Sequence, residues 1–414
     1  MIDERLALNK IPLNKLPSEV MAIFNIFEEN VRLVGGAVRD LIINYPINDY
    51  DFACILSPEQ IIQTLKHHNI QAVTTAIKYG TITAIIDKFH MQITTLRIDN
   101  NYAGRHCAVQ FTDDYYADAS RRDFTINALY LDHHGTIYDY FDGVKDLKNR
   151  CLRFIGDPTT RIAEDYLRIL RFFRFSCYYA NDFDDAGLAS CLKNLDSLDK
   201  LSKERVREEF CKILACPNIN NVVRAFKIFE HHQIDQKLWQ NKIDVEAYEN
   251  ISKLTSIQPI SELAKITTLF FNKDFLLQKF FENFKCPNAE KKYLTKFTNY
   301  VIDLGIDLQL IKKTNQLLAF ENKQLVIDYY LISFSKNYLD ITQNDLEIII
   351  NNIINSHIPE FIIKIADLEN ISCPKHQLSK LYKILKIKWA EKNFAISYDA
   401  LIAEAQKILL TNNL

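Results

Sequence analysis

Residues 31–40, Val-Arg-Leu-Val-Gly-Gly-Ala-Val-Arg-Asp, decide the fold of the first part of the 414-residue chain. The apolar residues predict a strand, Gly35 and Gly36 a tight turn, and the residues after them the start of a helix. Backbone N–H groups at such a helix start can bind an anion, and Arg39 can add a charge-assisted contact to phosphate. A glycine pair more often marks a plain strand-to-helix turn, so this stretch alone leaves phosphate binding open.

Two carboxylates follow closely, in the sequence Asp49-Tyr50-Asp51. Residues i and i+2 of a strand point to the same face, so these carboxylates repel each other unless a cation lies between them. A hard divalent ion such as Mg²⁺, bridging to nucleotide phosphates, is the usual solution. The alternative is a solvated acidic strand end. The position just after the Gly-Gly-x-x-Arg element favours the metal, which makes Asp49 and Asp51 the candidate catalytic and metal-binding residues.

A third cluster, Arg121-Arg122-Asp123, is followed by an apolar stretch that contains Asn127. Adjacent arginines suit the oxygens of a triphosphate. Asp123 can accept a hydrogen bond from a ribose hydroxyl, which would select ribonucleotides. We therefore include Arg122, Asp123 and Asn127 among the candidate nucleotide-binding residues.

The fourth cluster lies in residues 161–175, where the apolar residues recur with helical spacing. Asp165 and Arg168 are expected on one helical face, where they could form a plain i,i+3 salt bridge. The alternative is recognition of a nucleobase, because cytosine and adenine each offer an amino donor beside a ring-nitrogen acceptor. A carboxylate only accepts and a guanidinium only donates, so the pair would admit C and A and refuse U and G. Arg171, one turn further, completes the candidate set.

The amino-acid composition is that of an ordinary globular protein, and its low content of glycine and proline indicates few turns. The 50 basic and 52 acidic residues leave a net charge of −2, which excludes a polybasic binder. The nine cysteines form no C-x-x-C pair, which argues against a zinc ribbon or a disulfide framework and for a reducing compartment. We see no signal peptide and no apolar run long enough for a membrane span. We therefore expect a cytoplasmic protein with no membrane association and no obligatory protein partner.

Glycine marks a boundary, because seven of the nine glycines fall in the first 156 residues. Tight turns and close approaches to ligands need glycine, so the chemistry should lie in that part. Strand signals there predict two hairpins, and helical spacing dominates afterwards. The expected elements are hairpins at 81–86 with 91–96 and at 126–131 with 136–140, and helices at 17–27, 37–43 and 58–67.

The C-terminal half carries a lysine-rich stretch around Trp389. This stretch could bind an RNA backbone, or it could be a solvated helix face, and the sequence leaves the two interpretations even. The candidate RNA-binding residues are Lys380, Lys383, Lys386 and Lys388.

These clusters, in this order, resemble the class II tRNA nucleotidyltransferase and bacterial poly(A) polymerase family. The matching motifs cover residues 31–214 and read GGAVRD, DYD, GTIT, TTLR, RRDFTINA, DYFDGVKDL, RIAEDYLRILRFFRF and, more weakly, LSKERVREEF. The resemblance implies an α+β fold. Its parts would be a polymerase-β-like nucleotidyltransferase head with a small mixed sheet at 1–150, a helical neck with the base-recognition helix at 151–215, and a helical body and tail that bind tRNA at 216–414.

The same resemblance implies the activity and the roles of the residues. Asp49 and Asp51 would bind Mg²⁺, Gly35, Gly36 and Arg39 would hold the triphosphate, and Asp165 with Arg168 would select CTP and then ATP. The expected reaction adds C, C and A to the 3′ end of tRNA without a nucleic-acid template. The alternatives are a poly(A) polymerase, an enzyme that adds only CC or only A, and a catalytically inactive RNA-binding relative.

Two further features bear on those alternatives. Gln92 stands in the strand before TTLR, where the family pattern leads us to expect an acid, so a third carboxylate is unassigned. The segment 99–118 resembles the element that the family uses in switching from C to A, which argues against CC-only addition.

Overall fold

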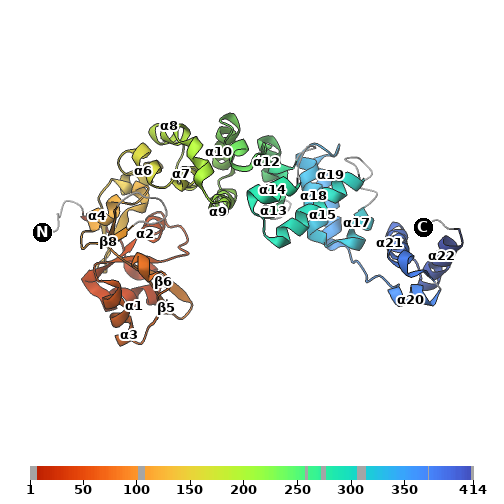
Figure 1. The fold of residues 1–414 in the computed structure, drawn as a ribbon, viewed down its shortest axis with the longest axis horizontal. Coiled ribbons are helices and arrows are strands. Elements are labelled where there is room, and N and C mark those ends of the chain that lie inside the picture. The colour runs from red at the N-terminus through yellow and green to blue at the C-terminus, as the bar shows by residue number, and fades with distance from the viewer. Residues whose placement is uncertain are drawn as a thin grey trace. The chain divides into compact units, whose positions relative to one another are not determined.

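The computed structural model describes residues 7–100, 108–256, 260–271, 277–304, 314–371 and 373–411. The chain divides into two compact units, Met1–Ala225 and Phe226–Leu414, and the division falls within helix α10 (Ile219–His231). Both units are drawn in Figure 1. The first unit contains all the motifs of residues 31–214. The boundaries expected at residues 150 and 215 stay predictions.

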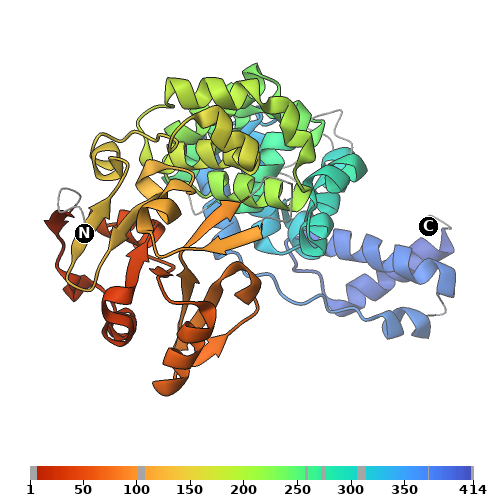
Figure 2. The same cartoon turned by 60° about the vertical axis from the view of Figure 1, so that its left-hand side comes forward.

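The first unit is built on a mixed sheet of eight strands in the order β1-β10-β9-β2-β3-β6-β5-β4, whose strands are drawn as arrows in Figure 2. Strands β3 and β6 pair in parallel and the other neighbours pair antiparallel. A separate hairpin is formed by β7 (Arg97–Asn100) and β8 (Ala108–Phe111). The eight strands are β1 (Ala7–Lys10), β2 (Val31–Val34), β3 (Asp51–Cys54), β4 (Gln71–Val73), β5 (Thr81–Ile86), β6 (Phe89–Thr95), β9 (Leu129–Leu131) and β10 (Thr136–Asp139).

Three helices form near this sheet where the sequence predicts them. Helix α1 (Ser18–Phe27) buries its apolar residues at helical spacing, as an amphipathic helix packed on a sheet must. Helix α2 (Gly36–Ile42) begins directly after β2, and α3 (Pro58–His67) begins with a capping box in which Ser57 accepts from the Gln60 N–H. Buried side chains from α1, α2, α3 and the strands make one core. The predicted α+β head is thereby confirmed.

One predicted strand is shorter than expected. Residues Thr125–Asn127 form a 3-10 turn, and β9 begins only at Leu129. The Asn127 N–H bonds to the Phe124 carbonyl at 3.0 Å, and this tight turn directs the Asn127 amide at Asp123. Residues 126 and 127 therefore form part of a turn fixed by polar side-chain contacts, where the apolar pattern predicts strand.

The rest of the first unit is helical, and one predicted helix is broken. Helix α6 (Pro158–Glu164) ends before Asp165, and α7 (Leu167–Tyr179) begins after Tyr166. Asp165 has extended backbone angles (φ −150°, ψ 108°), and its carboxylate accepts from the Leu167 N–H at 3.0 Å. Asp165 and Arg168 therefore do not share one continuous helix. The remaining helices of this unit include α4 (Tyr115–Ser120), α5 (Gly143–Lys148), α8 (Asp185–Lys193) and α9 (Lys203–Leu214).

The described part of the second unit contains helices and no strands. Its described core clusters include one around α18 (Lys323–Ser335) and α19 (Gln343–Asn355) and one around α20 (Ile365–Asn370), α21 (Lys375–Glu391) and α22 (Tyr398–Leu410). None of the described helices is both long and apolar enough to cross a membrane. Its helices are α11 (Ile234–Trp239), α12 (Val245–Ser252), α13 (Glu262–Phe270), α14 (Leu277–Phe284), α15 (Asn288–Leu304), α17 (Thr314–Phe320), α18 (Lys323–Ser335), α19 (Gln343–Asn355), α20 (Ile365–Asn370), α21 (Lys375–Glu391) and α22 (Tyr398–Leu410).

Candidate functional site

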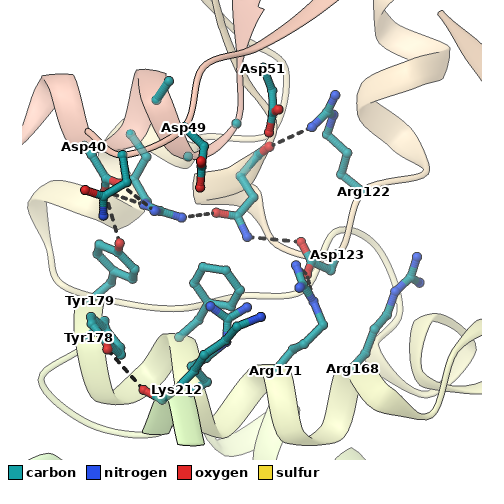
Figure 3. A pocket seen from close by; sticks show the side chains of 18 of the residues that line it. Asp40, Asp49, Asp51, Arg122, Asp123, Arg168, Arg171, Tyr178, Tyr179 and Lys212 are labelled. Carbon is teal, nitrogen blue, oxygen red and sulfur yellow. Dashed lines mark hydrogen bonds and ion pairs between the residues drawn. The ribbon is translucent and has the colours of Figure 1, made fainter. Parts of the chain in front are cut away.

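A cavity of about 810 Å³ lies within the first unit, and all eleven predicted catalytic and nucleotide-binding residues line it. Its walls come from α2, the loop before β3, the segment 121–127 and helices α7 and α9 (Figure 3). Eight cationic and five acidic side chains line the cavity, so its charge suits an anionic ligand. The eleven residues are Gly35, Gly36, Arg39, Asp49, Asp51, Arg122, Asp123, Asn127, Asp165, Arg168 and Arg171.

Gly35 serves the site through its conformation. Its φ of +72° is a region that L side chains rarely adopt, and a Cβ here would lie 3.4 Å from the Arg122 Nη1 atom. Its N–H donates to the Leu129 carbonyl at 3.0 Å, so that group is not free for a phosphate. The Gly35 N–H is therefore used by strand β9, and phosphate binding by the N–H groups at the start of α2 stays a prediction.

The two predicted metal ligands stand at the start of β3. Asp51 is the first residue of the strand and Asp49 lies two residues before it, and both side chains are exposed. Desolvation raises the pKa of Asp51; the Arg122 charge opposes the rise and the Asp49 charge adds to it. Among the residues that the structure describes, no three His, Cys, Asp or Glu side chains gather as a metal site. Among the described residues, no third acidic side chain therefore joins Asp49 and Asp51 to form a three-ligand metal site.

A chain of hydrogen bonds joins the head to helix α7. The Arg39 Nη1 atom donates to Asn127 Oδ1 at 2.6 Å, and Asn127 Nδ2 donates to Asp123 Oδ1 at 3.1 Å. Arg171 Nε then donates to Asp123 Oδ2 at 2.7 Å. Arg39 also donates from Nε to Asp40 Oδ1 at 2.8 Å and from Nη2 to Asp40 Oδ2 at 2.9 Å.

These contacts define what Asp123 and Arg39 can do. Burial alone would raise the pKa of Asp123, but the Arg171 charge and the Asn127 hydrogen bond hold that pKa below its ordinary value. Asp123 is therefore a fixed carboxylate that already accepts hydrogen bonds on both oxygens. Arg39 is likewise buried and paired, and it does not reach freely toward a ligand.

Asp118 is a buried residue that holds two arginines of the cavity wall, and its role was not predicted from the sequence. It is 1% exposed and accepts from Arg121 Nη2 at 2.7 Å, Arg122 Nη2 at 3.1 Å and the Tyr130 hydroxyl at 2.7 Å. Desolvation would raise its pKa, but the two arginines and Tyr130 lower the pKa to about 2. Its spacing of three and four residues from the arginines was the available signal.

Asp165 and Arg168 both face the cavity, but each has another partner. Asp165 Oδ2 accepts from Arg205 Nη2 of α9 at 2.8 Å, and Arg168 Nη1 pairs with Glu164. Arg168 also donates to the carbonyls of Arg161 at 2.8 Å and Arg121 at 3.1 Å. The alternative of an i,i+3 salt bridge between Asp165 and Arg168 is therefore not what these contacts show: Asp165 pairs with Arg205, and Arg168 pairs with Glu164.

Phe175 of α7 brings three guanidinium groups together. Their carbon atoms lie 4.2 Å (Arg174), 5.1 Å (Arg171) and 5.3 Å (Arg39) from the ring centroid. Cation–π attraction acts over such distances and offsets part of the repulsion among like charges. The helical spacing of residues 161–175 gave no sign of this role of Phe175.

The lysines of the C-terminal helix α21 differ among themselves. Trp389, which they were expected to surround, is 2% exposed and packs in the core against Phe361 and Phe394. Lys388 pairs with Glu404, and the Lys386 ammonium lies 4.9 Å from the Phe320 ring centroid. Lys380 and Lys383 are exposed. The tryptophan is therefore part of the core and offers no surface for RNA.

The segment proposed to resemble the C-to-A switching element is described only in part. Its residues 101–107 lie outside the described residues. The flanking strands β7 and β8 pair antiparallel, with Arg97 opposite Phe111.

Comparison with known proteins decides the family. The model described as "Poly A polymerase head domain" matches residues 31–153, and "Probable RNA and SrmB- binding site of polymerase A" matches residues 183–231. The mitochondrial CCA tRNA nucleotidyltransferase 1 of Homo sapiens is 29% identical over 391 residues, covering 91% of this chain and 86% of the relative. A CCA-adding enzyme of Lactobacillus helveticus is 31% identical over 313 residues, covering 71% of this chain and 75% of the relative.

The chain belongs to the CCA-adding enzyme family. Solved members of that family share its fold. The Bacillus stearothermophilus CCA-adding enzyme in complex with CTP aligns with a TM-score of 0.74 at 20% identity, covering 96% of this chain and 98% of that one. The Thermotoga maritima CCA-adding enzyme complexed with tRNA aligns with a TM-score of 0.67 at 16% identity, covering 97% of each chain. The predicted family and the α+β fold with a helical remainder are confirmed.

Proposed function

We propose that this chain adds C, C and A to the 3′ end of tRNA from CTP and ATP, without a nucleic-acid template. The observation that carries the proposal is one cavity that places the Asp49–Asp51 pair and the groups Asp165 and Arg168 around the same space, in a member of the CCA-adding family. The carboxylate pair suits the reacting phosphate, and the second pair suits a base edge.

The two carboxylates fit a hard divalent cation. Asp49 and Asp51 are exposed to the cavity, and Arg122 is the cation whose charge acts on Asp51 from within the protein. Carboxylate oxygens are the ligands that Mg²⁺ prefers, and Mg²⁺ commonly takes one or two carboxylates together with substrate phosphates. We propose that Asp49 and Asp51 hold Mg²⁺. When bound there, the metal would lower the pKa of an attacking hydroxyl and neutralise charge on the triphosphate.

The cationic wall supports binding of the triphosphate. Arg122 and Arg171 line the cavity, and their acidic partners Asp118 and Asp123 fix their positions. Because Arg39 is buried and paired with Asp40, we propose that it positions Asn127 and Asp123. Asp123 Oδ1 already accepts from the Phe124 N–H and the Asn127 amide, and Oδ2 is held by Arg171, so a ribose hydroxyl that donates to Asp123 would have to displace one of these partners.

The base would be read by Asp165 and Arg168. Arg205 and the Leu167 N–H hold one carboxylate, and Glu164 with two backbone carbonyls holds the guanidinium. Fixed groups discriminate better than mobile ones, because a mismatched base cannot reorient them. Asp165 would accept a hydrogen bond from the amino group of C or A, while Arg168 would donate a hydrogen bond to the neighbouring ring nitrogen. U and G present the opposite pattern at that edge.

In the reaction, the 3′-hydroxyl oxygen of the RNA attacks the α-phosphorus in line. A new P–O bond forms as the bond from the α-phosphorus to the bridging oxygen breaks, and pyrophosphate leaves. Little covalent work falls to the protein, so positioning and electrostatic stabilisation carry the rate.

The test is to incubate the purified chain with tRNA that lacks CCA, Mg²⁺, and CTP, ATP or both, and then to sequence the 3′ ends. We expect CC with CTP alone and CCA with both nucleotides. Omission of the metal, or its replacement by Ca²⁺, should reveal whether Mg²⁺ is required. Long A tails on arbitrary RNA would overturn the proposal in favour of a poly(A) polymerase.

We also propose a reducing, cytoplasm-like compartment. Eight cysteines among the described residues are free thiols, and six of them are buried. Fractionation of the native source with antibodies against the chain tests this assignment.

A further inference from the structure

Helices α7 and α9 lie side by side and run in the same direction along the cavity. Three contacts give their register: Asp165, just before α7, with Arg205 at 2.8 Å, Arg174 with Glu209 at 2.7 Å, and the Tyr178 hydroxyl with the Lys212 carbonyl at 3.0 Å. Both ends of this helix pair line the same cavity. The proposed function uses only the end that carries Asp165 and Arg168.

The unused end is too far from the base-reading groups to contact the same base. Arg168 and Tyr178 are ten residues apart on α7. At about 1.5 Å of rise per residue, this separates their positions along the helix by about 15 Å. Figure 3 shows Arg168 and Tyr178 toward opposite sides of the cavity, with Arg171 between them and Asp49 and Asp51 on the facing wall.

The chemistry of this end suits a nucleic-acid strand. Two cations, Arg174 and Lys212, share one buried carboxylate, Glu209, at 2.7 and 3.7 Å, which leaves an excess positive charge. The Lys212 side chain is about half exposed (53%), so its ammonium can reach a phosphate. Phosphate contacts from such cations position RNA without reading its sequence.

An aromatic ring stands beside these cations. The Tyr178 hydroxyl donates to the Lys212 carbonyl, which fixes the ring at the cavity wall, and the ring centroid lies 5.9 Å from that of Tyr179. The Tyr179 ring is already covered by the Arg39 guanidinium at 4.0 Å. A half-buried aromatic ring next to cations is the usual platform on which single-stranded bases stack.

We propose that the end of the cavity formed by Arg174, Tyr178 and Lys212 binds the 3′-terminal nucleotides of the RNA acceptor strand. The inference rests on the proposed function. In that reaction the RNA strand must bring its 3′-hydroxyl to the phosphate held near Asp49 and Asp51, and it must approach from the side that the incoming base does not occupy. Tyr178 stacks on an unpaired base of the strand, and Lys212 contacts its phosphate.

The experiment measures binding of 5′-labelled tRNA lacking CCA to the full chain by fluorescence anisotropy, together with KM values for CTP. Tyr178→Leu should weaken tRNA binding roughly tenfold, the scale of one lost base stack. Tyr178→Phe, which keeps the ring, should stay within about twofold of wild type, and the KM for CTP should change little in either variant.

A shortened RNA sharpens the test. A tRNA that lacks its unpaired 3′ nucleotides as well should bind wild type and Tyr178→Leu about equally. Lys212→Ala should lower the slope of log affinity against log salt by about 0.7, the value for one single-strand phosphate contact. Lys145→Ala is the control, because Lys145 is exposed on α5 and does not line the cavity.

Equal weakening of both RNAs by Tyr178→Leu, or a raised KM for CTP in place of weaker tRNA binding, would overturn the inference. If the Tyr178→Leu variant does not fold, the Lys212→Ala variant decides the question. An unchanged slope of log affinity against log salt in that variant would also overturn the inference. Wild type that binds tRNA but adds no nucleotide would refute the proposed function and not this subsite, because the binding assay needs no turnover.

Discussion

Gln92 of β6 is the cross-strand neighbour of Asp51 of β3 in a parallel register. Neighbouring residues in register point to the same face of a sheet, and both side chains are exposed. The residue that stands where the family pattern leads us to expect an acid is therefore adjacent to a proposed metal ligand. Its amide can accept or donate a hydrogen bond but adds no negative charge.

Gln92→Glu should strengthen metal binding. A third carboxylate beside Asp51 adds a charged oxygen ligand, so we expect the Mg²⁺ concentration for half-maximal addition to fall roughly two- to tenfold. Nucleotide addition is measured across a Mg²⁺ titration. Gln71→Glu, an exposed position on the outer strand β4, is the control. An unchanged Mg²⁺ dependence would mean that position 92 does not reach the metal.

Asp51→Asn should abolish addition while the fold survives. The change keeps the side-chain shape and removes a negative charge from a repelling pair, so the free energy of unfolding should change by less than about 0.5 kcal/mol. Addition should fall by at least about 10³-fold, because the developing charge loses its stabilisation. Single-turnover assays and thermal unfolding measure the two effects. Near-normal turnover would remove Asp51 from the metal site.

Asp118→Asn should destabilise the head and weaken nucleotide binding. Two partly buried arginines, Arg121 and Arg122, lose their carboxylate partner, which costs roughly 1–3 kcal/mol. Urea unfolding at pH 7 measures the loss, and Asp113→Asn, an exposed neighbour, is the control.

The pH dependence gives Asp118 a second signature. Its pKa is lowered to about 2 in the fold, from about 4 in the unfolded chain. The carboxylate therefore contributes about 2 kcal/mol of stability above pH 4, and this contribution is lost as pH falls from 4 toward 2. The difference between wild type and Asp118→Asn should shrink over that range. A difference that stays constant down to pH 2 would contradict the assignment.

Phe175→Leu should raise the KM for CTP and ATP by roughly three- to tenfold with a smaller effect on kcat. The Phe175 ring attracts the guanidinium groups of Arg39, Arg171 and Arg174, each by about 0.5–2 kcal/mol of cation–π energy. A leucine side chain has no aromatic ring and loses this attraction. Phe175→Tyr keeps the ring and should restore the KM. Phe172→Leu removes a fully buried ring that stacks on Phe154, so it should lower thermal stability without raising the KM. Equal KM values for the Leu and Tyr variants at 175 would contradict this role.

Local patterns predicted most of the head because they depend on neighbours in sequence. Alternating and helical spacing placed β5, β6 and α3 correctly, and the Asp49–Asp51 spacing brought both carboxylates to the cavity. Contacts between distant residues were not predictable in this way. Asp165 meets Arg205, which is 40 residues away, only because α7 and α9 run in parallel.

Polar contacts also overrode local periodicity in two places. Asn127 turns the backbone toward Asp123 where apolar residues predicted strand, and Asp165 breaks a helix that its neighbours favour. In both cases a side-chain oxygen accepts a hydrogen bond that continuous secondary structure would not allow. Both residues lie in the cavity, where such departures are expected.

The most direct test of the central claim is a competition among CTP, ATP, UTP and GTP on tRNA lacking CCA, comparing wild type with Asp165→Ala. If the Asp165 carboxylate selects the base, its loss leaves the amino group of C or A without an acceptor, which costs roughly 1–3 kcal/mol. We predict that the variant is slow with every nucleotide and incorporates UTP and GTP nearly as well as CTP. A variant that refuses UTP as strongly as wild type would contradict the account, because Asp165 would then serve only to pair with Arg205.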